Sequence, residues 1–265
     1  MTLIAVCTIK GSVGATTTAV GLAATLPATA GAVLAECDPS GGELAVRYGL
    51  SAASGLMAAA GAARRFTADE DRDGFLARYA QMVTVGHARL EVVAASPGAR
   101  QARTALRVLA EHPRLVDPPG RVVVADCGRL DDDSTVWPLL VAASVVLVVA
   151  SGTAASVARL LDAADWLTRA ARGRIGLVLA PGGVYGADTV AGFLADHTLG
   201  LPIVGELPYD PRAARALDTP GPRRGRRSRL ETALRGIAET VYTRPATQPA
   251  PSPAQPAVAA KEGPR

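Results

Sequence analysis

The sequence predicts an α/β fold built on a doubly wound, mostly parallel β-sheet of about seven strands. Short apolar runs rich in Val, Ile and Leu alternate with longer Ala- and Leu-rich segments, as expected when strands covered on both faces alternate with helices. Hydrophobic residues make up 49% of the 265 residues and charged residues 20%, which is enough apolar material for a large core. Aromatic residues make up only 4%, so this core must consist mainly of Ala, Val and Leu.

The expected elements follow in chain order. The expected strands are the short apolar runs Leu3–Thr8, Ala32–Glu36, Leu90–Ala94, Arg121–Asp126, Val145–Ala150, Ile175–Ala180 and Ile203–Glu206. The expected helices are the longer segments Thr16–Leu26, Arg100–Glu111, Ala155–Ala171, Ala187–His197 and Leu230–Tyr242. This alternation predicts right-handed βαβ units around one sheet. The charged segment Asp69–Arg78 is expected to be a surface helix or an insertion.

One segment resembles a membrane span in length. Val136–Ala158 carries no charged residue and could cross a bilayer. It also contains Pro138, Gly152 and several Ser and Thr residues, so we interpret it as a short helix, the buried strand Val145–Ala150, a turn and the start of another helix. We therefore expect no transmembrane segment.

The chain divides into one domain, residues 1–243, and a tail, residues 244–265. The tail is rich in Pro and Ala and cannot form a core, so it is predicted to be disordered. Three cysteines, Cys7, Cys37 and Cys127, form neither a CxxC pair nor a zinc-finger spacing, which fits a reducing compartment. No secretory signal pattern opens the sequence, so we expect a cytoplasmic protein.

Residues 10–17 have the pattern of a phosphate-binding loop. The expected strand Leu3–Thr8 runs into Lys-Gly-Ser-Val-Gly-Ala-Thr-Thr, and a helical pattern follows. Glycines let backbone N–H groups turn inward around an anion, and the helix N-terminus adds partial positive charge. An ordinary βα turn is the alternative. It accounts less well for Lys10, because the chain has only two lysines, the other being Lys261.

This loop resembles the deviant Walker A motif of the ParA/MinD family of P-loop ATPases, KGGxGK[ST]. Lys10 matches the signature lysine, and Gly11 and Gly14 match the loop glycines. Thr16 matches the hydroxyl that binds Mg²⁺. The resemblance implies that the nucleotide-binding residues of the loop are Lys10, Gly11, Ser12, Val13, Gly14, Ala15, Thr16 and Thr17.

Two positions of the loop depart from the family pattern. Ser12 replaces a glycine, which is a mild change. Ala15 stands where the family has its second lysine, the cation that neutralises the β- and γ-phosphates. Losing that charge removes several kcal/mol of transition-state stabilisation, by analogy with other preorganised electrostatic groups. The chain therefore resembles a divergent member of the ParA/MinD family, of the CpaE-like or actinobacterial type.

The second expected strand ends in Glu36-Cys-Asp-Pro-Ser-Gly-Gly42, where the family has a D-x-D-P-x-G-like segment. The resemblance makes Asp38 a catalytic residue that orients the attacking water, and it places Glu36 where the family has an earlier aspartate. The alternative is a strand-end turn in which Asp38 caps the next helix.

Two further strand ends complete the expected site. The run Arg121–Asp126 resembles Walker B, which makes Asp126 the second Mg²⁺ residue beside Thr16. Pro208, Tyr209 and Asp210 match the family segment that lies against the adenine, although Asp210 also suits an N-cap followed by Pro at the first helical position. Ala180 takes the place of the Asn with which the family often recognises the base.

An arginine-rich segment lies late in the chain. Residues 212–229 contain seven arginines and one acid, Asp218. Guanidinium clusters bind phosphate backbones without reading sequence, and ParA-type relatives bind DNA in this way. The candidate DNA-binding residues are Arg223, Arg224, Arg226 and Arg227. A solvated loop is the alternative.

The resemblance implies a homodimer that binds ATP and Mg²⁺, with Lys10 reaching the partner's phosphates as a second catalytic group. The expected role is a switch for partitioning, positioning or assembly of a cellular machine, with weak or absent ATP hydrolysis. One alternative is a non-hydrolysing adaptor for a division, pilus or secretion system. Another is an ATP-dependent enzyme of the CobQ or dethiobiotin synthase type. Histidine-ligated metal sites and serine-hydrolase chemistry are disfavoured, because the histidines have no ligand spacing and GxSxG is absent.

Overall fold

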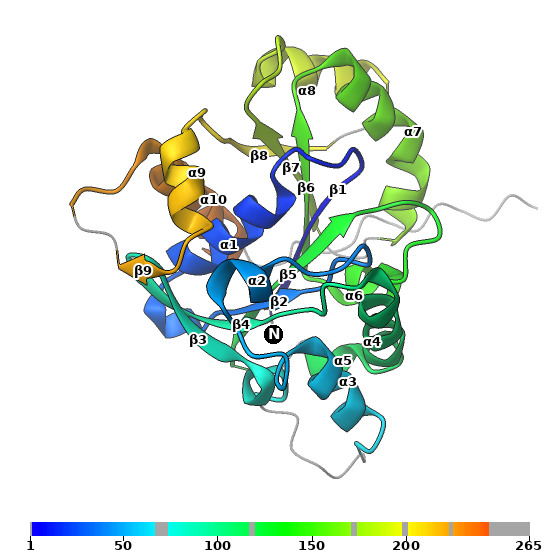
Figure 1. The fold of residues 1–265 in the computed structure, drawn as a ribbon. Coiled ribbons are helices and arrows are strands. Elements are labelled where there is room, and N and C mark those ends of the chain that lie inside the picture. The colour runs from blue at the N-terminus through cyan, green and yellow to red at the C-terminus, as the bar shows by residue number, and fades with distance from the viewer. Residues whose placement is uncertain are drawn as a thin grey trace, which may run out of the picture.

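A β-sheet runs through the centre of the molecule, with helices on both of its faces (Figure 1). The computed structural model describes residues 2–66, 74–116, 120–170, 174–197, 201–222 and 225–243. The predicted tail, residues 244–265, lies outside these ranges, as do Arg223 and Arg224.

The described strands are β1 (Thr2–Thr8), β2 (Val33–Glu36), β3 (Gln81–Gly86), β4 (Ala88–Val93), β5 (Val122–Arg129), β6 (Val145–Ser151), β7 (Arg174–Ala180), β8 (Ile203–Glu206) and β9 (Gly221–Pro222). They form one sheet in the order β8-β7-β6-β1-β5-β2-β4-β3-β9. Neighbouring strands are parallel except for β3 and β4. The predicted doubly wound, mostly parallel α/β fold is therefore confirmed.

The sheet has nine described strands where about seven were expected. The additional strands lie at one edge: β9 has two residues, and β3 forms a hairpin with β4 that turns at His87. In β3, Val83 and Val85 are buried while Met82 is 51% exposed. This alternation is that of a strand covered on one face. The prediction relied on continuously apolar runs and therefore missed β3.

The described helices are α1 (Ala15–Thr25), α2 (Leu44–Tyr48), α3 (Leu56–Ala63), α4 (Ala99–Glu111), α5 (Pro113–Val116), α6 (Trp137–Ala142), α7 (Ala154–Ala170), α8 (Ala187–Asp196), α9 (Pro211–Leu217) and α10 (Arg229–Thr243). The expected helices correspond to α1, α4, α7, α8 and α10, each within a residue or two. The expected surface helix Asp69–Arg78 is described only from residue 74, and a short 3₁₀ helix, Leu76–Tyr79, lies there.

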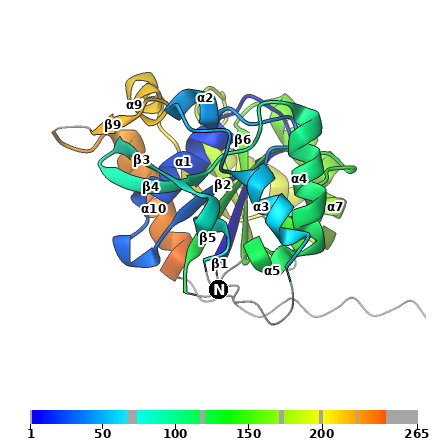
Figure 2. The ribbon, with the colours of Figure 1, turned by 60° about the horizontal axis from the view of Figure 1, so that its bottom comes forward.

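Two apolar clusters hold the layers together. One contains side chains of α3, α4, α5, α6, α7 and α8. The other, on the opposite face of the sheet, contains side chains of α1, α2, α9 and α10. Figure 2 shows the two groups of helices on either side of the strands. Among the described helices, none is long and apolar enough to cross a membrane.

The topology places the loops of interest at one end of the sheet. From β1 the chain winds through β2, β4 and β5 on one side, and β6, β7 and β8 lie on the other. The winding direction therefore reverses beside β1. In open α/β sheets this switch point, at the carboxyl ends of the strands, is where ligands bind. The segments that follow β1, β2, β5, β7 and β8 all emerge at this end.

Candidate functional site

The loop after β1 contains the predicted phosphate loop, residues 10–17, and enters α1 through two residues with positive φ. β1 ends at Thr8, whose hydroxyl donates to the carbonyl oxygen of Lys10 at 2.8 Å. Gly14 precedes α1 with φ of +90°, and no side chain caps this helix. Ser12 has φ of +66° and is the one non-glycine residue with positive φ in the described chain. Ser12 therefore keeps a conformation that favours glycine, at a cost of roughly 1 kcal/mol.

The first residue of α1, Ala15, brings no charged side chain to this loop. Ala15 is 7% exposed and packs in the apolar cluster that contains Ile4 and Val6. Lys10, by contrast, is exposed at the start of the loop. The first turn of α1 therefore offers backbone amides and no side-chain cation.

Asp126, on β5, is a buried carboxylate with unused hydrogen-bonding capacity. Only 1% of the Asp126 surface is exposed to solvent. Oδ1 accepts a hydrogen bond from the Gly128 amide at 3.2 Å, whereas Oδ2 has no hydrogen-bond partner among the described residues. Burial raises the pKa of Asp126 to about 7; the Thr16 side chain counteracts this and the nearby Glu36 carboxylate adds to it. A buried oxygen without a partner is unfavourable unless something binds it.

Thr16 and Asp126 fit a Mg²⁺ ion. A hard cation takes oxygen ligands, and these residues bring a hydroxyl and a free carboxylate oxygen together at the end of β1. The described residues contain no group of three or more His, Cys, Asp or Glu that could hold a metal. The ion would therefore take most of its ligands from phosphates and water, as Mg²⁺ at nucleotide sites does.

Glu36, at the end of β2, has a structural role. Its Oε1 accepts hydrogen bonds from the amides of Glu43 and Leu44 at 2.6 and 3.0 Å, and its Oε2 accepts one from Ala95 at 2.9 Å. Burial raises the pKa of Glu36, and the three amides oppose that shift. A Cβ at Gly42 would lie 2.4 Å from Oε2, so only glycine fits there. The carboxylate thus fixes the loop that carries Asp38.

Asp38 lies at the same corner as Asp126. Its Oδ1 accepts a hydrogen bond from the Ser40 amide at 2.7 Å, so it closes a turn and does not cap α2, whose N-cap is Glu43. A Cβ added to Gly128 would lie 2.1 Å from Cγ of Asp38. Since the Gly128 amide also donates a hydrogen bond to Asp126, the last residues of β5 lie against both aspartates.

A cavity of about 300 Å³ joins the phosphate loop to the segment after β8. Its lining includes seven of the predicted residues: Ser12, Val13, Gly14, Thr17, Pro208, Tyr209 and Asp210. The other predicted loop residues, Lys10, Gly11, Ala15 and Thr16, do not line it. Asp210 is also the N-cap of α9, because its side chain accepts a hydrogen bond from the Ala213 amide at 2.9 Å. Tyr209 is 81% exposed beside the cavity.

Other residues of this cavity were missed by the sequence analysis. Pro181, directly after β7, lines it, as do Leu207 and, from α10, Leu230 and Leu234. The helical periodicity of α10 was visible in the sequence. Its position beside the phosphate loop depends on packing against α1, which no local pattern reports.

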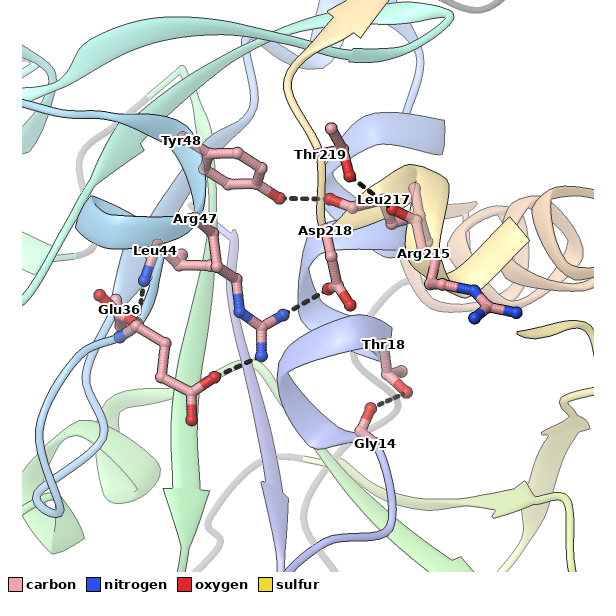
Figure 3. A network of polar contacts seen from close by, with 11 residues as sticks. Gly14, Thr18, Glu36, Leu44, Arg47, Tyr48, Arg215, Leu217, Asp218 and Thr219 are labelled. Atoms are coloured by element: carbon pink, nitrogen blue, oxygen red, sulfur yellow. Dashed lines mark hydrogen bonds and ion pairs between the residues drawn. The ribbon is translucent and has the colours of Figure 1, made fainter. Parts of the chain in front are cut away.

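A brace of polar contacts links α2 to the end of α9 (Figure 3). Arg47 forms ion pairs with Glu43 and with Asp218. The Tyr48 hydroxyl donates a hydrogen bond to the Leu217 carbonyl oxygen at 2.6 Å. Because α2 follows the Asp38 loop and α9 follows Tyr209 and Asp210, the brace connects the two sides of the candidate site.

The described part of the Arg-rich loop lies away from the phosphate loop. Arg226 and Arg227 are exposed. Arg227 lines a separate cavity of about 600 Å³ together with Arg89, Arg121 and Arg235. This cavity also contains the end of α1 and the starts of β4 and β5, so it lies at the opposite end of the sheet.

The three cysteines are free and buried in the same apolar cluster. Burial raises the pKa of each thiol. A thiol that resists ionisation is a poor nucleophile and a poor metal ligand. Cys7, Cys37 and Cys127 are accordingly packing residues.

Known structures share this fold. No protein-family model matches the chain, and no curated protein matches it by sequence. MinD from Pyrococcus horikoshii in complex with Mg-ADP has a TM-score of 0.64 and 15% identity, over 91% of this chain and 96% of that one. A ParA family ATPase from Chlorobium tepidum has a TM-score of 0.64 and 16% identity, over 89% and 97%. A McdA variant from Cyanothece in complex with ATP has a TM-score of 0.64 and 17% identity, over 94% and 99%. The chain has the fold of these MinD, ParA and McdA structures.

Proposed function

We propose that this protein is a ParA/MinD-like switch that binds ATP with Mg²⁺. The observation that carries the proposal is the meeting of three features at one sheet end. These are the loop whose positive-φ residues precede an uncapped helix, the unpartnered Oδ2 of Asp126 beside Thr16, and the adjoining cavity of about 300 Å³. Related folds were solved with Mg-ADP and with ATP, which supports the same ligand here.

Each part of the site has a role in this proposal. The amides of residues 11–17 bind the phosphates, and Pro181, Pro208 and Tyr209 cover the base. Thr16 and Asp126 hold the Mg²⁺, which neutralises charge on the phosphate oxygens. Asp38 orients the attacking water. The exposed Lys10 reaches the phosphates of a second copy, so that bound ATP favours a homodimer.

Ala15 makes hydrolysis slow or absent. Its methyl group is packed into the core, so the helix start contributes no cation to the developing charge. This observation favours a second candidate function, a nucleotide-binding adaptor that does not turn over ATP and docks on a division, pilus or secretion machine. In either case the nucleotide state controls assembly with a partner.

Binding and turnover assays separate these functions. We expect the wild-type chain to bind Mg-ATP, and Ala15→Lys to raise phosphate release at least tenfold. Lys10→Ala should weaken ATP-dependent dimerisation, measured by light scattering, while Arg103→Ala, an exposed change on α4, should not. A wild-type chain that binds no ATP at any accessible concentration would refute the proposed function. Measurable wild-type turnover that Asp38→Ala abolishes would exclude the adaptor.

The Arg-rich loop is the proposed surface for non-specific DNA. Arg226 and Arg227 are exposed, and Arg227 lines the cavity of about 600 Å³ together with three further arginines and two acids, Glu91 and Glu239. Replacing Arg223, Arg224, Arg226 and Arg227 by Ser should weaken binding to duplex DNA and flatten its dependence on salt. Unchanged affinity in this variant would show that the loop is merely solvated.

A further inference from the structure

Arg129 lies beside the phosphate loop because of strand register. It is the last residue of β5 and pairs with Thr8, the last residue of β1. The Leu130 amide donates a hydrogen bond to the Thr8 carbonyl oxygen at 2.8 Å, which fixes this pairing. The phosphate loop begins at Lys10, two residues after Thr8, so Arg129 lies at its edge.

The side chain of Arg129 lies against the loop at Gly11. A Cβ built on Gly11 would lie 3.7 Å from Cδ of Arg129, an ordinary van der Waals distance. The guanidinium group begins at the next atom of the side chain. Its charge is therefore carried at the start of the phosphate loop, next to Lys10.

Arg129 also lacks a competing partner. Arg47 and Arg121 form ion pairs with nearby acids. The side chain of Arg129 is exposed and forms no ion pair or hydrogen bond with the described residues. An exposed guanidinium without such contacts can bind a ligand without first breaking an ion pair or hydrogen bond.

We propose that Arg129 binds the phosphate chain of ATP and so replaces the cation that Ala15 cannot provide. This inference rests on the proposed function, because it assigns a residue to the same site. A guanidinium suits the task, because its planar donors can bind two phosphate oxygens at once and it stays charged at every physiological pH. The charge thus reaches the phosphates from β5 instead of from the first turn of α1.

Calorimetric titration of the full chain with Mg-ATP tests this assignment. We expect Arg129→Ala to weaken ATP affinity at least tenfold, and Arg129→Lys to weaken it less. Both variants should bind AMP almost as tightly as the wild type does, because AMP lacks the distal phosphates. Arg103→Ala is the matched control, since it removes an exposed arginine from α4, and it should leave all affinities unchanged.

A double variant gives the decisive comparison. If Arg129 replaces the missing lysine, adding Ala15→Lys to Arg129→Ala should restore most of the lost ATP affinity. Equal ATP affinities for Arg129→Ala and Arg103→Ala would overturn the assignment of Arg129 and leave the proposed function intact. Equal losses of ATP and AMP affinity would also overturn it, because they would indicate a general structural defect. Absence of ATP binding by the wild type would overturn both proposals.

Discussion

Two buried carboxylates on neighbouring strands have opposite surroundings. Glu36 ends β2 and is paired in register with Asp126 on β5, and both are almost fully buried. Glu36 accepts three backbone hydrogen bonds, so both of its oxygens are satisfied. Asp126 has one oxygen without a partner among the described residues. The Glu36 carboxylate therefore stabilises the loop after β2, whereas the Asp126 carboxylate on β5 does not saturate its hydrogen-bonding capacity within the described chain.

The largest effect should come from removing the satisfied carboxylate. Glu36→Ala leaves the amides of Glu43, Leu44 and Ala95 without their acceptors, which should lower the free energy of unfolding by about 3 kcal/mol. Urea denaturation measures this change. Glu111→Ala, at an exposed position on α4, is the control and should change little. A loss below about 0.5 kcal/mol for Glu36→Ala would contradict its structural role.

The unpartnered carboxylate should behave in the opposite way. Asp126→Asn removes a buried charge, so at pH 8 without nucleotide the variant should be more stable than wild type, by on the order of 1–3 kcal/mol. Comparison of urea midpoints at pH 8 checks this. A variant that is less stable than wild type at this pH would show that Asp126 serves the fold, as Glu36 does.

The pH dependence of stability sharpens the same contrast. The pKa of Asp126 rises from 3.8 to about 7 on folding because of burial, so the folded state holds a proton that the unfolded state releases. The stability contributed by this proton is present below pH 4 and is lost as the pH rises through 7. The difference in unfolding free energy between Asp126→Asn and wild type should therefore grow from pH 4 to pH 8. A difference that does not change over this range would argue against the raised pKa.

The brace between α2 and α9 should give a smaller effect. Tyr48→Phe removes the hydroxyl that bonds the Leu217 carbonyl oxygen and keeps the buried ring, which should cost about 1 kcal/mol. Arg47→Ala should cost less, because its ion pairs are partly exposed to solvent. Thermal unfolding measures both. If Tyr48→Phe matches wild type, the brace does not contribute to stability.

The smallest effect should come from the loop backbone. Ser12→Gly relieves the positive φ of residue 12 and should stabilise the protein by about 0.5 kcal/mol, whereas Ser12→Ala keeps the strain. Denaturation of the two variants side by side checks this. Greater stability of Ser12→Ala than of Ser12→Gly would show that residue 12 does not adopt the left-handed conformation in solution.

Local sequence patterns were enough to predict the fold and the location of the candidate site. Lys10, Asp38 and Asp126 each follow or end an apolar run, and the carboxyl ends of parallel strands meet at one edge of a sheet. Their roles as binding or catalytic residues stay predictions. The alternation in β3 is also present in the sequence, but it differs from the continuously apolar pattern that most of the predicted strands share.

What the sequence did not reveal depends on contacts between distant segments. Arg129 lies beside Gly11 because β5 and β1 are adjacent and in register, and no local pattern encodes that register. The three amides on Glu36 come from a loop and from the end of β4. Leu230 and Leu234 reach the cavity because α10 packs on α1.

The affinity of the full chain for ATP, titrated calorimetrically with Mg²⁺ and again with EDTA, tests the account most directly. We expect wild type to bind ATP at least tenfold more tightly with Mg²⁺ than without it. Asp126→Asn should bind ATP with the same low affinity in both conditions. Two results would contradict this expectation: a wild-type ATP affinity that does not depend on Mg²⁺, or an Asp126→Asn variant that retains the full Mg²⁺ effect. Either would show that the free carboxylate oxygen of Asp126 does not take part in binding Mg-ATP.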